Sequence, residues 1–290
     1  MIMVKRKGNK MHTFAGIVLF NPEIERLKEN LQAIVPQVVE VVLIDNCSQN
    51  IAEIKNLLRQ FQTCKLVENN ENKGIATALN QILGYAAAND YEWFLTLDQD
   101  SVCSERLIET YEKFVSFEKI GMVTSLVVDR NYTGSMSFIG NEEYHYVTYC
   151  ITSGALVNTK ACRECGGWDD VLFIDNVDGE ICIHLKKLGY KVLSVKFNGI
   201  LHEIGHGRDV KFLWKKDVVY NHPAFRQYYM ARNRVYVARK YPEEFILRKE
   251  LLKELRNYRL ILFFEKNKFE KMRARIKGVK DGFKLKITDQ

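Results

Sequence analysis

Two carboxylates, those of Asp98 and Asp100, follow directly after an apolar stretch at residues 93–97. If that stretch is a β-strand, side chains two positions apart point to the same side, so the two carboxylates lie next to each other. Neighbouring carboxylates repel each other unless a divalent cation binds them, and oxygen ligands of this kind suit Mg²⁺ or Mn²⁺. A D-x-D spacing arises by chance in many proteins, but its place at the end of a predicted strand favours a metal site.

A second acidic group, Asp175, Asp178 and Glu180, lies at the start of a helix that we predict over residues 178–188. Carboxylates are favoured in the first turn of a helix because they cap it and interact with its dipole, which explains one or two of the three. These effects do not explain three carboxylates together, so we favour a functional role for the group.

Two histidines, His202 and His206, lie in a glycine-containing loop that follows a predicted strand at residues 191–195. A single histidine is more often structural than a ligand. Because the carboxylate pair already suggests a metal, His202 is the preferred further ligand and His206 the weaker candidate.

The elements that must position these side chains alternate regularly in the first half of the chain. We expect strands at residues 13–20, 40–44, 65–68 and 93–97, and helices at 23–34, 52–61 and 75–88. This alternation is typical of an α/β fold with a mainly parallel sheet and helices on both faces. Ligands of such sheets bind beyond the carboxyl ends of the strands. Polar residues follow all four predicted strands and predict a ligand site at that edge: Asn21, Asp45 with Asn46, Asn69 with Asn70, and Asp98 to Asp100.

The formal charge of +7 is concentrated in the last part of the chain. Residues 249–290 contain 13 Lys and Arg against six Asp and Glu, so the other 248 residues are neutral on balance. We expect a catalytic domain at 1–222 and helices with a basic tail at 223–290, the helices covering 225–240 and 243–264. The tail either lies on an anionic membrane surface, forms a homo-oligomer contact or is a solvated face; its apolar stripe comprises Leu251, Leu255, Tyr258, Leu262 and Phe263.

Several classes of protein are excluded by what the sequence lacks. Its longest apolar runs are about six residues, whereas a bilayer span needs roughly 20 and a signal peptide also needs a longer run. We therefore expect a cytoplasmic chain, and the tail leaves peripheral association with the inner face of the plasma membrane open. The single C-x-x-C, Cys162 to Cys165, lacks a second pair and is expected to hold buried thiols. No G-x-G-x-x-G, P-loop or G-x-S-x-G motif is present, and the tail has too few aromatic residues for a nucleic-acid partner.

Seven features in the same order make residues 12–240 resemble the family 2 glycosyltransferases of the GT-A fold, in particular the bacterial rhamnosyltransferases and galactofuranosyltransferases. The features are AGIVLFNP, VVLIDNCSQN, ENNENKGIATALNQIL, WFLTLDQDS, ITSGALV, FIDNVDGEICIHLKKLGY and the later His202. The resemblance implies a Rossmann-like, mainly parallel sheet with helices on both faces and a C-terminal helical extension.

The resemblance also implies a role for each matching residue. Nucleotide-sugar binding would involve Phe20, Asn21, Asp45, Asn72, Lys73, Gly74, Asp98 and Asp100. Asp100 and His202 would hold Mn²⁺ or Mg²⁺, and Asp178 would be the catalytic base, with Asp175 and Glu180 on the acceptor side. One departure is His184, which stands where many relatives have arginine.

The activity implied is metal-dependent, inverting transfer of a sugar, with rhamnose preferred, from dTDP-rhamnose or a UDP-sugar. The acceptor would be a hydroxyl of a bacterial surface polysaccharide, such as a capsule or cell-wall glycan, or of its lipid-linked precursor. A cation stabilises the charge that develops on a diphosphate leaving group, and a base takes the acceptor proton. The alternatives are an inactive nucleotide-sugar-binding module, a galactofuranosyl or hexosyl transferase, and, less favoured, a nucleotidyltransferase.

Overall fold

The computed structural model describes residues 11–130, 141–202, 207–212 and 215–287, and the chain forms two compact units. The first unit spans Met1–Lys73, Ala78–Gly167 and Cys182–Glu203, and the second spans Gly74–Thr77, Trp168–Ile181 and Ile204–Gln290. The boundary that the sequence predicts between residues 222 and 223 stays a prediction; the second unit contains residues 74–77, 168–181 and 204–222 in addition to the C-terminal helices. His206, the weaker metal candidate, lies outside the described residues.

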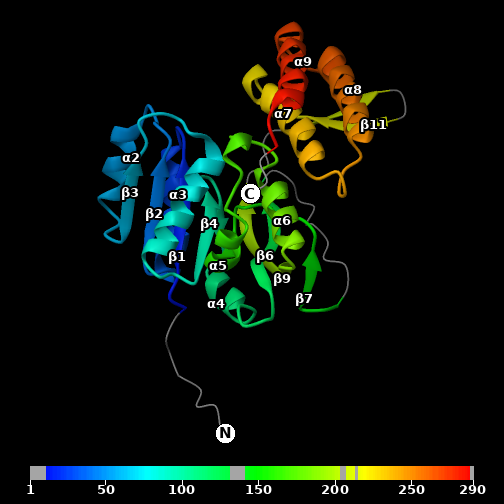
Figure 1. The fold of residues 1–290 in the computed structure, drawn as a ribbon. Coiled ribbons are helices and arrows are strands. Elements are labelled where there is room, and N and C mark those ends of the chain that lie inside the picture. The colour runs from blue at the N-terminus through cyan, green and yellow to red at the C-terminus, as the bar shows by residue number, and fades with distance from the viewer. Residues whose placement is uncertain (1–10, 131–140, 203–206, 213–214, 288–290) are drawn as a thin grey trace. The chain divides into compact units, whose positions relative to one another are not determined.

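Nine strands of the described chain form one sheet in the first unit (Figure 1). Its first half is parallel, in the order β3-β2-β1-β4, and the predicted βαβ pattern is confirmed there by β1 (Phe14–Leu19), β2 (Val41–Asp45), β3 (Cys64–Glu68) and β4 (Trp93–Asp98). The second half is mixed and continues from β4 in the order β8-β6-β9-β5, with β7 paired to β9. Its strands are β5 (Val102–Cys103), β6 (Ile120–Asp129), β7 (Tyr144–Val147), β8 (Ala155–Asn158) and β9 (Lys191–His202).

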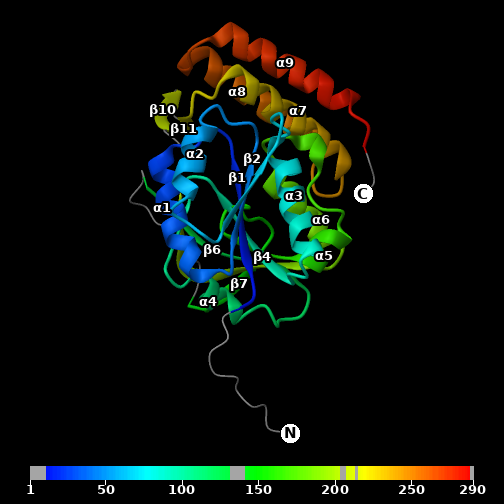
Figure 2. The same ribbon diagram turned by 90° about the vertical axis from the view of Figure 1, so that its left-hand side faces the viewer.

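Helices cover both faces of this sheet (Figure 2). One face packs against α1 (Ile24–Ile34), α2 (Ile51–Leu58) and α4 (Leu107–Glu112), whose apolar side chains share a core with those of β1, β2 and β4. On the other face lie α3 (Gly74–Ala88) and α5 (Thr159–Glu164). Since both faces are covered, β1 and β2 are almost entirely buried, which explains why their sequences read as continuous apolar runs.

The second unit is mainly helical. Its long helices are α7 (Ala224–Lys240), α8 (Leu247–Phe264) and α9 (Lys268–Lys284), and a hairpin joins β10 (Arg208–Phe212) to β11 (Lys215–Val219). The 3₁₀ turn Asp170–Leu172 and the first residues of α6 (Val177–Lys187) also belong to it. The sequence predicted α7 closely and began α8 four residues early, but it did not predict α9.

In the described part of the chain, no helix is both long and apolar enough to cross a membrane. Cys162 and Cys165 are fully buried free thiols, as expected.

Candidate active site

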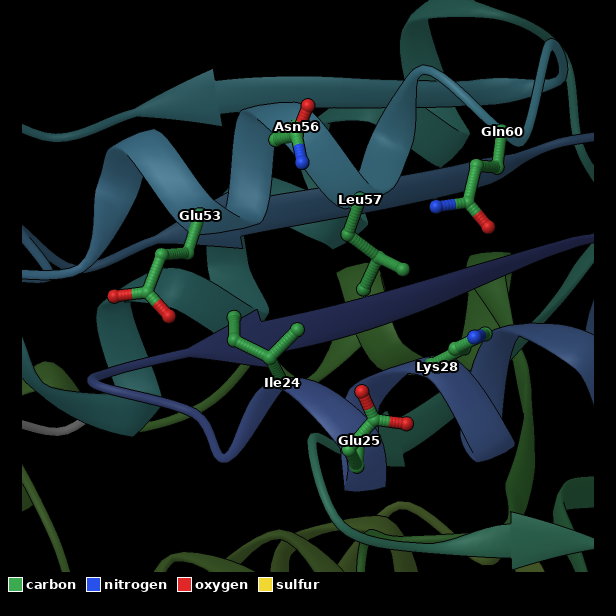
Figure 3. A pocket seen from close by; sticks show the side chains of 7 residues that line it. All are labelled: Ile24, Glu25, Lys28, Glu53, Asn56, Leu57 and Gln60. Carbon is green, nitrogen blue, oxygen red and sulfur yellow. The ribbon is translucent and has the colours of Figure 1, made fainter.

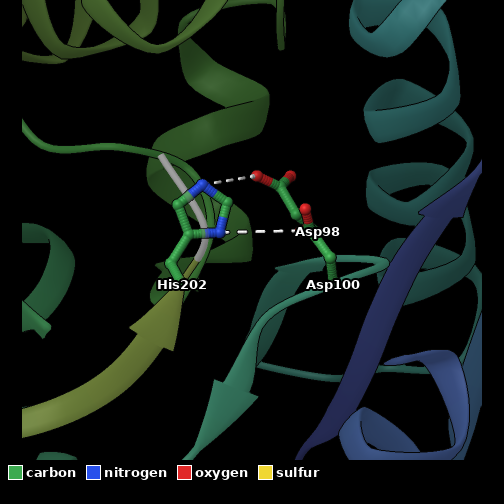
Figure 4. A group of neighbouring side chains, drawn as sticks. All are labelled: Asp98, Asp100 and His202. Carbon is green, nitrogen blue, oxygen red and sulfur yellow. Dashed lines mark ion pairs between the residues drawn. The ribbon is translucent and has the colours of Figure 1, made fainter. Parts of the chain in front are cut away.

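Asp98, Asp100 and His202 come together in the first unit (Figure 4). Nδ1 of His202 lies 3.6 Å from Oδ1 of Asp100, and Nε2 lies 4.0 Å from Oδ2 of Asp98. One ligand atom from each of the three side chains lies within 4.8 Å of the others. The sequence placed His202 in a loop, but β9 runs on to this residue because it pairs with β6 through register shifts and with β5 at Leu201.

Two buried serines hold this arrangement. Oγ of Ser101 lies 2.8 Å from Nδ1 of His202 and 2.7 Å from Oγ of Ser153, which in turn accepts a hydrogen bond from the Asp98 backbone N–H at 2.9 Å. Partners of this kind fix the orientation of a metal-ligating imidazole. Neither serine is among the predicted site residues, although Ser101 directly follows the D-x-D motif.

The donor set fits a divalent cation. The carboxylates of Asp98 and Asp100 are 49% and 38% exposed, and His202 is 16% exposed, so a ligand has access to the group. Carboxylate oxygens suit Mg²⁺ and Mn²⁺, and one imidazole nitrogen makes the set more favourable for Mn²⁺. These three side chains would hold such an ion.

The loops after β1, β2 and β4 are joined at the same edge of the sheet, as predicted. The Phe20 backbone N–H donates to Oε1 of Gln99 at 2.9 Å, and the Asn21 N–H donates to Oγ of Ser48 at 2.8 Å. Asp45 is buried, and its Oδ2 accepts from the Ser48 N–H at 2.9 Å. Oδ1 of Asp45 is also buried but has no hydrogen-bond partner among the described residues. An unsatisfied buried carboxylate oxygen is costly, so it is a strong candidate to accept a hydrogen bond from a ligand.

A hollow of about 240 Å³ lies elsewhere in the first unit, between α1 and α2 (Figure 3). None of the predicted site residues lines this hollow. Among the residues that do line it, Lys28 is the one with a basic side chain. We therefore do not place the donor site there.

Gly74 begins α3 in the second unit, and its backbone conformation requires glycine. Its φ is +85°, and an added Cβ would lie 2.6 Å from Cδ2 of Phe173 and 2.7 Å from the Phe173 carbonyl oxygen. That carbonyl accepts a hydrogen bond from the Ile75 N–H at 2.6 Å. Gly74 and Ile75 are thus held where α3 starts, while the predicted role of Asn72, Lys73 and Gly74 in nucleotide binding stays a prediction.

The segment that leads to Asp178 has an unusual backbone. Phe173, Asp175 and Asn176 have φ values of 60°, 66° and 62°, a region that non-glycine residues seldom occupy. Buried Asn233 of α7 stabilises this conformation, because its Nδ2 donates to the carbonyl oxygens of Leu172, Ile174 and Asp175 at 2.7, 2.7 and 2.8 Å. We call these three hydrogen bonds the Asn233 clamp, and no sequence pattern predicted them.

The three acidic residues of the second cluster have different environments. Asp178 lies half-buried in the first turn of α6, while Asp175 pairs with Arg226 at 3.2 Å. The Glu180 side chain has no exposed surface, and its Oε1 accepts from Nζ of Lys240 at 2.8 Å and from the Tyr241 hydroxyl at 2.5 Å. Within the second unit the Glu180 carboxylate thus ties the first turn of α6 to the end of α7, while its predicted place on the acceptor side stays a prediction.

Lys240 completes this buried network, since its Nζ also lies 2.6 Å from Oδ2 of Asp169. Burial lowers the pKa of Lys240, but the charges of Glu180 and Asp169 outweigh it and leave the pKa above its ordinary value.

We expect Lys240→Met to reduce the free energy of unfolding by about 3–5 kcal/mol, because it leaves two buried carboxylates without a counter-ion. Urea unfolding measures the loss, with Lys249→Met on an exposed position as control. Equal stability of the two variants would contradict a buried ion-pair network.

Comparison with known proteins identifies the family. The model of glycosyl transferase family 2 matches residues 15–165, just over half of the chain, so the chain belongs to this family and is a glycosyltransferase. It is 27% identical to the dTDP-rhamnosyl transferase RfbF of Shigella flexneri, over 93% of this chain and 95% of that protein. It is 24% identical to a poly-beta-1,6-N-acetyl-D-glucosamine synthase of Staphylococcus epidermidis, over 64% of this chain but only about half (49%) of that relative.

Solved structures show the predicted GT-A fold. TarS of S. aureus (residues 1–349), in complex with UDP-GlcNAc, matches with a TM-score of 0.60 at 14% identity and covers 93% of this chain and 82% of its own. GalNAc-T7 with UDP, GalNAc and Mn²⁺ matches with a TM-score of 0.56 at 14% identity and covers 80% and 48%.

Proposed function

We propose that this glycosyltransferase moves rhamnose from dTDP-rhamnose to a hydroxyl of a bacterial surface polysaccharide or its lipid-linked precursor, with inversion and with bound Mn²⁺ or Mg²⁺. The observation that carries the proposal is the Asp98–Asp100–His202 cluster at the same sheet edge as Asp45, whose buried Oδ1 has no hydrogen-bond partner in the part of the chain that the structure describes. The similarity to a dTDP-rhamnosyl transferase along almost the whole chain supports the sugar. We place the reaction in the bacterial cytoplasm.

The first unit would bind the donor. The cation, when bound, would neutralise charge on the diphosphate as the sugar leaves. Ser101 keeps the imidazole of His202 in a fixed orientation. Oδ1 of Asp45 is an acceptor only, so it suits the ring N3–H that uracil and thymine carry and cytosine lacks. Phe20, which is 46% exposed beside this edge, would contact the base.

Asp178 would take the proton of the acceptor hydroxyl. A hydroxyl is a weak nucleophile at neutral pH, and a positioned base typically contributes on the order of 10²–10⁴-fold. Direct attack by the activated hydroxyl on the sugar carbon opposite the diphosphate inverts the configuration. The clamp formed by Asn233 would keep Asp178 in place for this step.

A second candidate is transfer from a UDP-sugar such as UDP-galactofuranose, UDP-galactose or UDP-glucose. The likeness to structures that contain UDP or UDP-GlcNAc favours this candidate. A hydrogen bond to Oδ1 of Asp45 is also compatible with it, because uracil and thymine both carry the ring N3–H. A panel of nucleotide sugars, which we call the donor panel, distinguishes transfer from dTDP-rhamnose from transfer from a UDP-sugar. It also distinguishes both activities from an inactive binding module.

The test is a thermal-shift panel of nucleotide sugars with Mn²⁺, followed by an assay for released nucleotide diphosphate. We expect dTDP-rhamnose to stabilise the protein most, by about 2.7 kcal/mol at a hundredfold excess over its Kd. Stabilisation by a UDP-sugar alone would favour the second candidate. Binding without any turnover, with an acceptor glycan present, would indicate a binding module, and no stabilisation by any donor would overturn the proposal.

A further inference from the structure

Helix α9 packs with its polar side inward. Its buried residues are Lys271, Arg275, Gly278 and Gly282. An added Cβ at Gly278 or Gly282 would come within 3.0 Å of a backbone carbonyl oxygen of α7, so the two helices lie in close contact. Arg275 donates to Glu254 of α8 at 2.6 to 2.9 Å. Part of the basic charge that the sequence attributed to the tail is therefore neutralised inside this unit.

Basic side chains next to the predicted apolar stripe, which lies on α8, are also partly paired. Arg256 and Arg259 both form ion pairs with buried Asp217 of β11. These two arginines stabilise the second unit, so α9 offers the better candidate for a binding surface.

The outward side of α9 combines apolar and basic side chains. Phe269, Ile276 and Phe283 are 88%, 45% and 44% exposed. They are spaced seven residues apart, which is close to two helical turns, so they form one strip along a helix about 26 Å long. Exposed Arg273 and Lys280 lie four residues, about one turn, after Phe269 and Ile276, next to the strip. Neither has an ion-pair partner in the part of the chain that the structure describes. We call these five residues the outer face of α9.

We propose that the outer face of α9 binds the surface of an anionic lipid bilayer, with the helix lying parallel to the membrane. Phenylalanine and isoleucine side chains on one side of such a helix enter the boundary between headgroups and acyl chains, and neighbouring basic side chains bind lipid phosphates. A second copy fits this surface less well, because a symmetric contact would bring the basic strips of two copies together. The inference does not depend on which sugar is transferred.

The test is co-sedimentation of the full chain with vesicles of phosphatidylcholine alone or mixed with phosphatidylglycerol. We expect binding to the mixed vesicles only. The double variant Arg273→Glu/Lys280→Glu should bind at least about tenfold more weakly, since each basic side chain near an anionic surface contributes roughly fivefold in affinity. The control Arg59→Glu/Lys113→Glu makes the same change in net charge on exposed positions of the first unit and should bind like the parent.

A second pair of variants separates apolar contact from charge. Phe269→Ser/Ile276→Ser should also bind more weakly while its thermal midpoint and its molecular mass by light scattering stay unchanged. Equal binding by the α9 and control double variants would overturn the proposal. So would a parent dimer that Phe269→Ser/Ile276→Ser converts to a monomer, because the face would then be a contact between copies. Neither result would affect the donor panel, which reports on the other unit.

Discussion

Asp178→Asn should lower kcat by at least about 10²-fold while the Kd for nucleotide sugar stays within about twofold of the parent, the loss being the low end of what a positioned base contributes. Asparagine keeps the shape of the side chain but cannot accept the acceptor proton. A loss confined to kcat marks an interaction made in the transition state rather than in binding. Steady-state kinetics with the preferred donor, together with calorimetric titration of the nucleotide, measures both quantities.

Asp175→Asn is the matched control, because it makes the same chemical change three residues earlier. The carboxylate of Asp175 pairs with Arg226, so its loss should cost stability rather than turnover. Should Asp175→Asn be the inactive variant while Asp178→Asn retains activity, the base has been assigned to the wrong carboxylate of the loop.

The second large effect is expected for Asp100→Asn, which should lose turnover by on the order of 10³-fold together with Mn²⁺-dependent nucleotide binding. A bound cation supplies several kcal/mol of stabilisation to a developing charge, and removal of one negative ligand weakens its binding. Titration of Mn²⁺ with and without nucleotide, and activity as a function of Mn²⁺ concentration, measure the effect.

Asp90→Asn is a suitable control for this substitution. Asp90 is exposed with a φ of 56°, a conformation that asparagine also adopts readily, so it should behave like the parent. Ser101→Ala should have a metal affinity between those of Asp100→Asn and Asp90→Asn. We expect a loss of about 10–100-fold relative to the parent, because the substitution removes the partner that orients His202. Near-normal activity of Asp100→Asn in chelator-treated buffer would rule out a metal role for the cluster.

Local sequence patterns were enough to predict the parallel half of the sheet and the carboxylates at its edge. Each strand there is buried on both faces, so it reads as an apolar run, and Asp98 and Asp100 follow one such run directly. The pattern fails where a tertiary partner decides the structure. β9 continues past exposed Lys196 because β6 pairs with β9 up to Val195 and again from Asn198. Glu180 is buried against Lys240, sixty residues further along the chain. The helix α9 escaped prediction because hydrophobic periodicity assumes that apolar side chains face inward.

The hydrogen bonds from Asn233 have a consequence for protein engineering. Asn233 belongs to the C-terminal helices, whereas the carbonyls that it holds belong to the loop before Asp178. A chimera that exchanges the helices of two relatives at residue 222 would pair the loop of one parent with the amide of the other. A graft that carries residues 168–181 together with residues 204–290 keeps both sides of the clamp from one parent. The loop and the helices therefore have to be exchanged together, although 22 residues of the other unit, 182–203, separate them in the sequence.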